Sequence, residues 1–163
     1  MKDARLSILL VAIVCAMIGC ADESLTTQTS STQFATKEEK IDFLNRYLVN
    51  RAGLLDAEYR IDYQDNGSGR GVPGPSDYDI YMIVRILPDS IDAWTSDVQQ
   101  QDFLISREMW SGVALDTSVW RVHSTPELYT SLGQVKLIYS AEGIVFAYYT
   151  TRELDIEKYK LEP

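Results

Sequence analysis

The sequence predicts an α+β fold, in which an antiparallel sheet of four to five strands is packed by an N-terminal amphipathic helix. Three observations lead to this prediction. Apolar residues follow helical spacing after residue 36, they alternate with polar residues after residue 54, and two further strand-like runs flank a turn near residue 140. Antiparallel strands with a helix segregated to one face belong to the α+β class.

The helix is predicted from residue 36 to residue 53. Thr36 and Glu39 fit a capping box, in which each side chain accepts a hydrogen bond from a backbone N–H at the start of the helix. The residues that then follow helical spacing are Ile41, Leu44, Tyr47, Leu48 and Arg51. Gly53 is expected to end the helix, because Gly readily adopts the left-handed conformation found after many helices.

Two strands are predicted next. From Leu55 to Gln64 apolar and polar residues alternate, which is typical of a half-buried strand. The second strand is predicted from Asp77 to Leu87, and the middle of it has apolar residues on both faces. A strand that is apolar on both faces is expected near the centre of a sheet or beneath a second element.

The second half of the chain gives a less even pattern. Pro88 and Asp89 open a short predicted helix that runs to about Ser96, and residues 97–132 contain many apolar residues without a clear period. Residues 134–139 and 143–151 predict a hairpin, with Gly143 able to adopt a positive φ in the turn. Residues 152–163 are highly charged and are predicted to be a peripheral tail.

The N-terminus has the features of an export signal. Lys2 and Arg5 precede Leu6–Ile18, a run of thirteen almost wholly apolar residues. This run is shorter than the roughly 20 residues of a membrane-spanning helix and has the length of a signal-peptide core. Met17-Ile18-Gly19-Cys20 follows, which resembles the lipobox of bacterial lipoproteins.

The resemblance implies that the chain is cut before Cys20 and that this residue is acylated. It divides the sequence into a signal peptide (1–19), a lipidated flexible tether rich in Ser and Thr (20–35), a single domain (36–151) and the charged tail (152–163). Several acyl chains on one Cys provide a stable anchor, whereas a single chain does not. In a Gram-negative cell, Ala21 after the Cys implies the outer membrane. The alternatives are an ordinary secretory signal and an uncleaved anchor.

Charge and cysteine content restrict the possible functions. The net charge is −9, and removal of residues 1–19, which carry Lys2, Arg5 and Asp3, changes it to −10. This balance disfavours nucleic acid as a partner and leaves membrane attachment to the acyl chains. Cys20 is the only Cys of the mature chain and His123 the only His. The sequence therefore predicts no disulfide, no zinc site, no cofactor and no catalytic residue set.

The candidate binding residues lie around a Gly-rich loop at residues 65–76. Arg70 is in this loop, and Asp77, Asp79 and Tyr81 project from one face of the strand that follows it. Loops on rigid scaffolds often bind ligands, and paired carboxylates can hold a proton or a cation. The alternatives are a mobile strand connection and a solvated strand end.

The sequence therefore favours a non-enzymatic, membrane-tethered envelope lipoprotein that binds a protein or cell-wall component through residues 65–79. A second hypothesis is a periplasmic inhibitor or immunity protein that captures a basic enzyme through the eight Asp residues between Asp62 and Asp102. A hydrolase using Asp77 and Asp79 is the third. The tryptophans at 94, 110 and 120 and the ten tyrosines are expected in the core, or else in a groove for a glycan or a protein partner.

Overall fold

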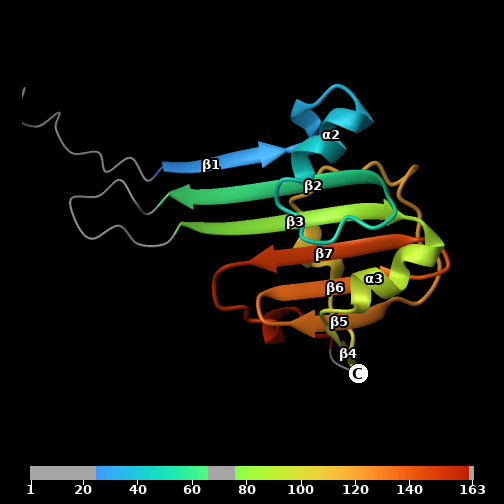
Figure 1. Cartoon of the computed structure of the whole chain (residues 1–163). Coiled ribbons are helices and arrows are strands. Elements are labelled where there is room, and N and C mark those ends of the chain that lie inside the picture. The colour runs from blue at the N-terminus through green and yellow to red at the C-terminus, as the bar shows by residue number, and fades with distance from the viewer. Residues whose placement is uncertain (1–24, 66–75, 162–163) are drawn as a thin grey trace, which may run out of the picture.

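The computed structural model describes residues 25–65 and 76–161, which form one seven-stranded antiparallel sheet (Figure 1). The strand order across the sheet is β1-β2-β3-β7-β6-β5-β4. The strands are β1 (Leu25–Ser30), β2 (Leu54–Asp65), β3 (Asp77–Ile86), β4 (Gln99–Gln101), β5 (Glu127–Ser131), β6 (Gln134–Tyr139) and β7 (Ile144–Thr150). The α+β class is confirmed, whereas the predicted number of four to five strands is wrong.

The additional strands lie in segments without apolar alternation. Residues 25–30, which the sequence analysis assigns to the flexible tether, form β1 and pair with β2 from Leu25↔Asp65 to Ser30↔Arg60. This edge strand is rich in Thr, which favours extended backbone, and its stability comes from backbone pairing rather than from a buried apolar face. The short strand β4 and strand β5 lie within residues 97–132, where the sequence showed no period.

Helix α2 (Lys37–Leu44) begins as predicted and ends earlier than predicted. Both hydrogen bonds of the capping box are present: the Glu39 N–H donates to Thr36 Oγ1 over 3.2 Å, and the Thr36 N–H donates to Glu39 Oε2 over 3.1 Å. The helix stops at Leu44, not near Gly53, because the chain turns there and brings Leu48, which is 5% exposed, into the core.

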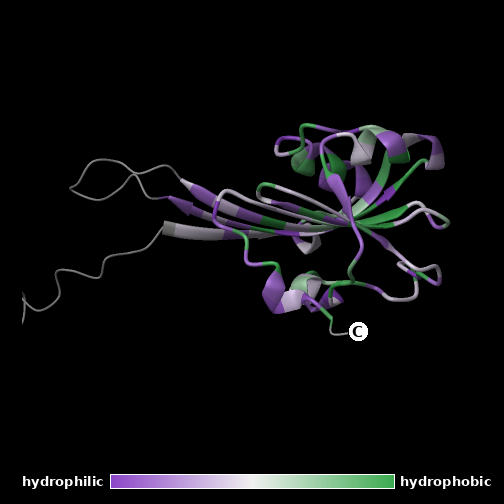
Figure 2. Cartoon of the chain, turned by 90° about the horizontal axis from the view of Figure 1, so that it is seen from below, coloured by the Kyte–Doolittle hydropathy of each residue, from purple (hydrophilic) through white to green (hydrophobic). Residues whose placement is uncertain are grey.

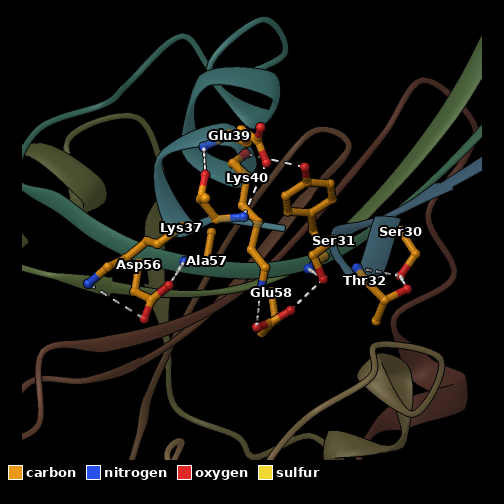
Figure 3. Close-up of polar contacts among 11 residues, drawn as sticks. Ser30, Ser31, Thr32, Lys37, Glu39, Lys40, Asp56, Ala57 and Glu58 are labelled. Carbon is orange, nitrogen blue, oxygen red and sulfur yellow. Dashed lines mark hydrogen bonds and ion pairs between the residues drawn. The ribbon is translucent and has the colours of Figure 1, made fainter. Parts of the chain in front are cut away.

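A polar network holds α2 and β1 against strand β2 (Figure 3). Glu58 of β2 accepts hydrogen bonds from Lys40 Nζ over 2.6 Å and from the Ser31 hydroxyl. Ser31 is fully buried, and its oxygen accepts a hydrogen bond from the Tyr59 N–H over 3.1 Å. The Tyr59 hydroxyl in turn donates to the Lys40 carbonyl over 3.2 Å. The connection between β1 and α2 is therefore fixed to the sheet by buried and half-buried polar groups.

The sheet has a hydrophobic core on each face (Figure 2). Helix α2 and helix α3 (Ile91–Thr95) cover one face, which we call the helix face. Loops within residues 103–122 and the C-terminal segment cover the other, which we call the loop face. Strand β3 lies between β2 and β7 and contributes Met82 to the helix face and Ile83 to the loop face, so its predicted central position is confirmed.

The C-terminal segment is part of the packed structure rather than peripheral. Leu154, Ile156 and Tyr159 pack against the loop-face core, and Lys160 forms a β-bridge with Ile105. The charges of this segment are interspersed with apolar residues, and those apolar residues determine its position. The predicted hairpin between β6 and β7 is confirmed, with Gly143 at φ 61° in the turn.

Candidate functional site

The predicted binding residues are only partly brought together. Arg70 lies outside the described residues. Asp79 and Tyr81 of β3 lie on the loop face, and strand alternation places Asp77 on the same side. Asp79 is 8% exposed, whereas Asp77 and Tyr81 are half-buried.

Asp79 and Tyr81 line a cavity of about 310 Å³, which we call the Asp79 pocket. The Tyr148 hydroxyl donates to Asp79 Oδ1 over 2.7 Å, and Arg152 Nη1 lies 3.6 Å from Asp79 Oδ2. The Tyr81 and Tyr148 rings stack with centroids 4.7 Å apart. Both oxygens of the Asp79 carboxylate are therefore occupied by side chains of this chain.

Arg60 closes one side of the Tyr81 ring. Its guanidinium carbon lies 4.6 Å from the ring centroid. Its Nε lies 3.1 Å from Asp62 Oδ2, so the two side chains form an ion pair, but the N–H of Nε is not aligned for a hydrogen bond. Burial raises the pKa of the Tyr81 hydroxyl, with a further contribution from Asp79, and burial likewise raises the pKa of Tyr148. At neutral pH both phenols remain protonated and do not act as bases, and the Tyr148 phenol donates to Asp79.

Asp77 does not line the Asp79 pocket. It accepts a hydrogen bond from Thr151 Oγ1 over 3.1 Å, at the end of the sheet. The two carboxylates thus share a strand face without sharing a cavity. Within the described ranges, no group of three or more His, Cys, Asp or Glu residues is arranged to hold a metal ion.

The three tryptophans are core residues. The core was the first of the two locations that we expected from the sequence. Trp94, Trp110 and Trp120 are at most 4% exposed. Trp94 Nε1 donates to the Ala52 carbonyl on the helix face, and Trp110 Nε1 donates to the Ala147 carbonyl on the loop face, each over 2.9 Å. The indoles of Trp94 and Trp110 thus join covering segments to the fold, and Trp110 and Trp120 also line a cavity of about 370 Å³ on the loop face.

A larger cavity, which the sequence analysis missed, lies on the helix face. This helix-face cavity has a volume of about 490 Å³ and lies between the turn that follows α2, helix α3 and strands β3, β6 and β7. Its apolar wall includes Leu48, Ile80 and Ala93. Its aromatic and polar lining includes Tyr47, Asn50, Tyr78, Asp97, Gln134 and Tyr149.

Asn50 fixes the turn that forms one wall of this cavity. Its Nδ2 donates to the Ala93 carbonyl of α3, and its Oδ1 accepts a hydrogen bond from the Ala52 N–H over 2.9 Å. Together with the bond from Trp94 to Ala52, these contacts join the turn at residues 47–52 to α3. The wall is therefore held in place by the protein itself, which lowers the cost of binding a ligand there.

Lys136 lies buried behind the cavity, with 1% of its side chain exposed. Its Nζ donates to the Trp94 carbonyl over 2.9 Å and to Asp97 Oδ1 over 2.7 Å. Asp97, half exposed, lines the cavity, so its charge is offset by Lys136 from behind. Burial raises the pKa of Tyr149, and Asp97 adds to this shift, so the Tyr149 phenol is protonated at neutral pH.

Gln134 is also among the residues that line this cavity. Its Oε1 is buried and has no hydrogen-bond partner in the part of the chain that the structure describes. A buried carbonyl oxygen without a partner is unfavourable, and such atoms in native proteins call for an explanation. This oxygen has almost no solvent-accessible surface, so it is not open to a ligand in the cavity.

No known protein family, curated protein or solved structure matches this chain. The helices found within residues 25–65 and 76–161 are too short or too polar to cross a membrane.

The missed cavity left a partial signal in the sequence. Tyr78 lies between the two Asp residues that the sequence analysis selected, and it points to the opposite face of β3. Tyr149 and Gln134 belong to the hairpin that was predicted correctly. These residues meet because Tyr149 of β7 pairs with Ile80 of β3 on one side and with Gln134 of β6 on the other. No local sequence pattern contains this strand pairing.

Proposed function

We propose that this chain is an exported, lipid-anchored protein whose domain is a non-enzymatic binding module, with the helix-face cavity as its ligand site. The observation that carries the proposal is a cavity of about 490 Å³ with an aromatic and apolar lining, one wall of which is fixed by the contacts of Asn50. Ligand sites commonly have volumes of about 300–1,000 Å³, a mostly apolar lining and a few polar groups that orient the ligand.

The Asp79 pocket gives less support to the hydrolase hypothesis. General acid–base catalysis by two carboxylates needs both groups to face one substrate. Asp79 is held by Tyr148 and Arg152, and Asp77 lies outside the pocket. The favoured binding function therefore differs from the first hypothesis in its site, which is the helix-face cavity and not the surface around Asp79 and Tyr81.

The inhibitor hypothesis also receives little support. A basic partner would need the acidic residues on one surface, but they are divided between the two faces. Asp79 lies on the loop face beside Arg152, whereas Asp97 lines the helix-face cavity beside Lys136. Each of these two carboxylates already has a cationic neighbour.

Lipidation of Cys20 would place the domain close to the membrane. Strand β1 begins at Leu25, five residues after Cys20. Five residues span at most about 17 Å. The end of the sheet where Leu25 pairs with Asp65 would then face the lipid surface, and the tether would be shorter than the sequence analysis predicts.

Metabolic labelling with an alkyne fatty acid tests the anchor. We expect label on the wild-type chain and on Cys15→Ser, and none on Cys20→Ser, because the acyl chains would be attached at residue 20. Equal labelling of wild type and Cys20→Ser would disprove lipidation at this residue.

Binding of N-phenyl-1-naphthylamine, a neutral apolar fluorophore, tests the cavity. The exported, processed protein is expected to bind one molecule with enhanced fluorescence. Ser96→Trp places a bulky side chain at the rim of the cavity and should abolish the signal, whereas Ser118→Trp, at another exposed site, should not. Equal fluorescence in the two variants would contradict the proposed site.

A further inference from the structure

We infer that a second cavity, on the loop face, binds a fatty acid through its carboxylate. This cavity, which we call the Arg107 cavity, has a volume of about 480 Å³. It shares no lining residue with the helix-face cavity or the Asp79 pocket, so the inference does not depend on the proposed ligand site. Its lining comes from residues 104–107 and 122–126, strand β6 and the C-terminal segment.

The charge of the lining favours an anion. Arg107 is the only Lys or Arg that lines the cavity, and no Asp or Glu of the described residues lines it. The smaller loop-face cavity beside Trp110 also includes Arg107 and likewise has no carboxylate in its described lining. Because the whole chain carries a net charge of −9, an anion at Arg107 would avoid the acidic side chains that dominate elsewhere.

The Arg107 guanidinium is open to solvent and faces the cavity. Arg107 is exposed, and its guanidinium lies beside the hydroxyl of Tyr139, which also lines the cavity. Burial raises the pKa of Tyr139, and the neighbouring guanidinium opposes this rise. Ser106 and Thr125 add hydroxyl groups to the same lining. A guanidinium can donate two parallel hydrogen bonds to one carboxylate, so this group suits a ligand with a single carboxylate.

The rest of the lining favours an apolar ligand body. Ile105 and Leu137 are buried in the loop-face core, whereas Leu104 and Leu161 are 46% and 49% exposed. The two exposed side chains belong to adjacent segments, because the Leu161 N–H donates to the Leu104 carbonyl over 2.9 Å. Exposed apolar side chains that gather around a cavity are typical of a surface that contacts a ligand. An acyl chain would cover both.

The backbone around the cavity distinguishes an acyl chain from a peptide. The Ser106 N–H donates to the Tyr159 carbonyl over 2.7 Å. The N–H groups of His123 and Ser124 donate to the carboxylate of Glu142, which does not itself line the cavity. These backbone donors are therefore already used within the protein. A peptide would leave some of its own amide groups unpaired there, which is unfavourable, whereas an acyl chain has none.

Isothermal titration calorimetry on the exported, processed protein tests the inference with three compounds. Octanoate carries a carboxylate and an acyl chain, 1-octanol carries the chain without the charge, and N-acetyl-leucyl-leucine carries a carboxylate on a peptide. We expect octanoate to bind most tightly and 1-octanol to bind roughly tenfold more weakly, because only a charged ligand gains the full hydrogen bonds of Arg107. Equal binding of octanoate and 1-octanol, or tighter binding of the peptide, would overturn the inference.

Two pairs of variants locate the binding. Arg107→Gln should weaken octanoate by roughly tenfold and leave 1-octanol unchanged, and retained 1-octanol binding shows that the variant is folded. Arg121→Gln is the matched control, because Arg121 is exposed and does not line the cavity. Leu161→Ser should weaken both compounds, whereas Leu132→Ser, at an exposed turn outside the cavity, should change neither. Octanoate binding that Arg107→Gln leaves intact would contradict the assignment.

A competition experiment separates this site from the helix-face cavity. Octanoate should not displace N-phenyl-1-naphthylamine, and Ser96→Trp should not change the affinity for octanoate. Displacement of the fluorophore, or loss of octanoate binding in Ser96→Trp, would place the fatty acid in the helix-face cavity. That result would overturn this inference and retain the proposed binding function. Absence of octanoate binding while the fluorophore still binds would have the same meaning.

Discussion

The helix-face cavity and the Asp79 pocket lie on opposite sides of the same strands. Tyr78 and Tyr149 face the first, whereas Asp79 and Tyr148 face the second. Neighbouring residues in the chain thus enter two different environments, because side chains alternate across a strand. One cavity has an aromatic and apolar lining, and the other is polar with its carboxylate already paired.

On our proposal, this difference separates a binding site from a structural one. In the Asp79 pocket, Tyr148 and Arg152 occupy the carboxylate, so a ligand would have to displace contacts within the protein. Most of the lining of the helix-face cavity is aromatic, apolar or amide, so a ligand would contact it without displacing the ion pair of a buried carboxylate.

The largest expected effect comes from removing one tryptophan from each face. Trp94→Ala and Trp110→Ala should each lower the free energy of unfolding by about 4 kcal/mol, because each removes a buried indole and its hydrogen bond. Urea denaturation measures this loss. Only Trp94→Ala should abolish fluorophore binding under conditions where both proteins remain folded, because Trp94 holds α3 beside Ala52. Equal loss of binding in both variants would remove the functional difference between the faces.

A smaller effect is expected at Asp79. Asp79→Asn keeps an acceptor for Tyr148 and removes the charge beside Arg152, so the free energy of unfolding should fall by about 1 kcal/mol. The expected fall in the free energy of unfolding is small because Arg152 is half exposed and its charge is screened by water. Thermal unfolding measures it, with Asp77→Asn as the matched control. A change of more than twofold in ligand affinity would show that the two cavities are coupled.

The smallest effect is a pH dependence confined to the loop face. Glu142 accepts hydrogen bonds from the Ser124 hydroxyl and from the N–H groups of His123 and Ser124, and these bonds lower its pKa to about 2. Because the folded pKa lies below the ordinary value of 4.5, this carboxylate stabilises the fold above pH 4.5, and the contribution is lost as the pH falls toward 2.

Melting temperatures between pH 6 and pH 2 test this dependence. Glu142→Gln should lower the melting temperature at pH 6 and flatten its decline below pH 4.5, relative to wild type. Glu153→Gln, at an exposed position on the same face, is the control and should keep the wild-type profile. A wild-type decline in Glu142→Gln would show that other carboxylates cause it.

Local patterns predicted the elements that are defined by neighbouring residues. The capping box at Thr36 and the turn at Gly143 appear in the structure because each depends on contacts within a few residues. The alternation in β2 and β3 was likewise visible. Strand β1 was missed because its Thr, Gln and Ser residues have no apolar period, and only pairing with β2 makes it a strand.

The candidate site depended on more distant contacts. Tyr148 and Asp79 are separated by 69 positions, and Lys136 is 42 positions from Trp94, whose carbonyl it contacts. No spacing rule indicates that Tyr47, Tyr78 and Tyr149 line one cavity. The sequence showed many aromatic residues and led us to expect them in the core, or else in a groove, without indicating the face on which they gather.

The sequence by itself determined the α+β class, the start of α2, the two long strands and the C-terminal hairpin, because periodicity and capping act over a few residues. Only the tertiary structure decided which alternating residues meet. Strand register buries Asp79 among its partners and brings Tyr78, Tyr149 and Gln134 to the lining of one cavity. Register is a property of pairs of strands, and it therefore becomes visible only once the sheet is assembled.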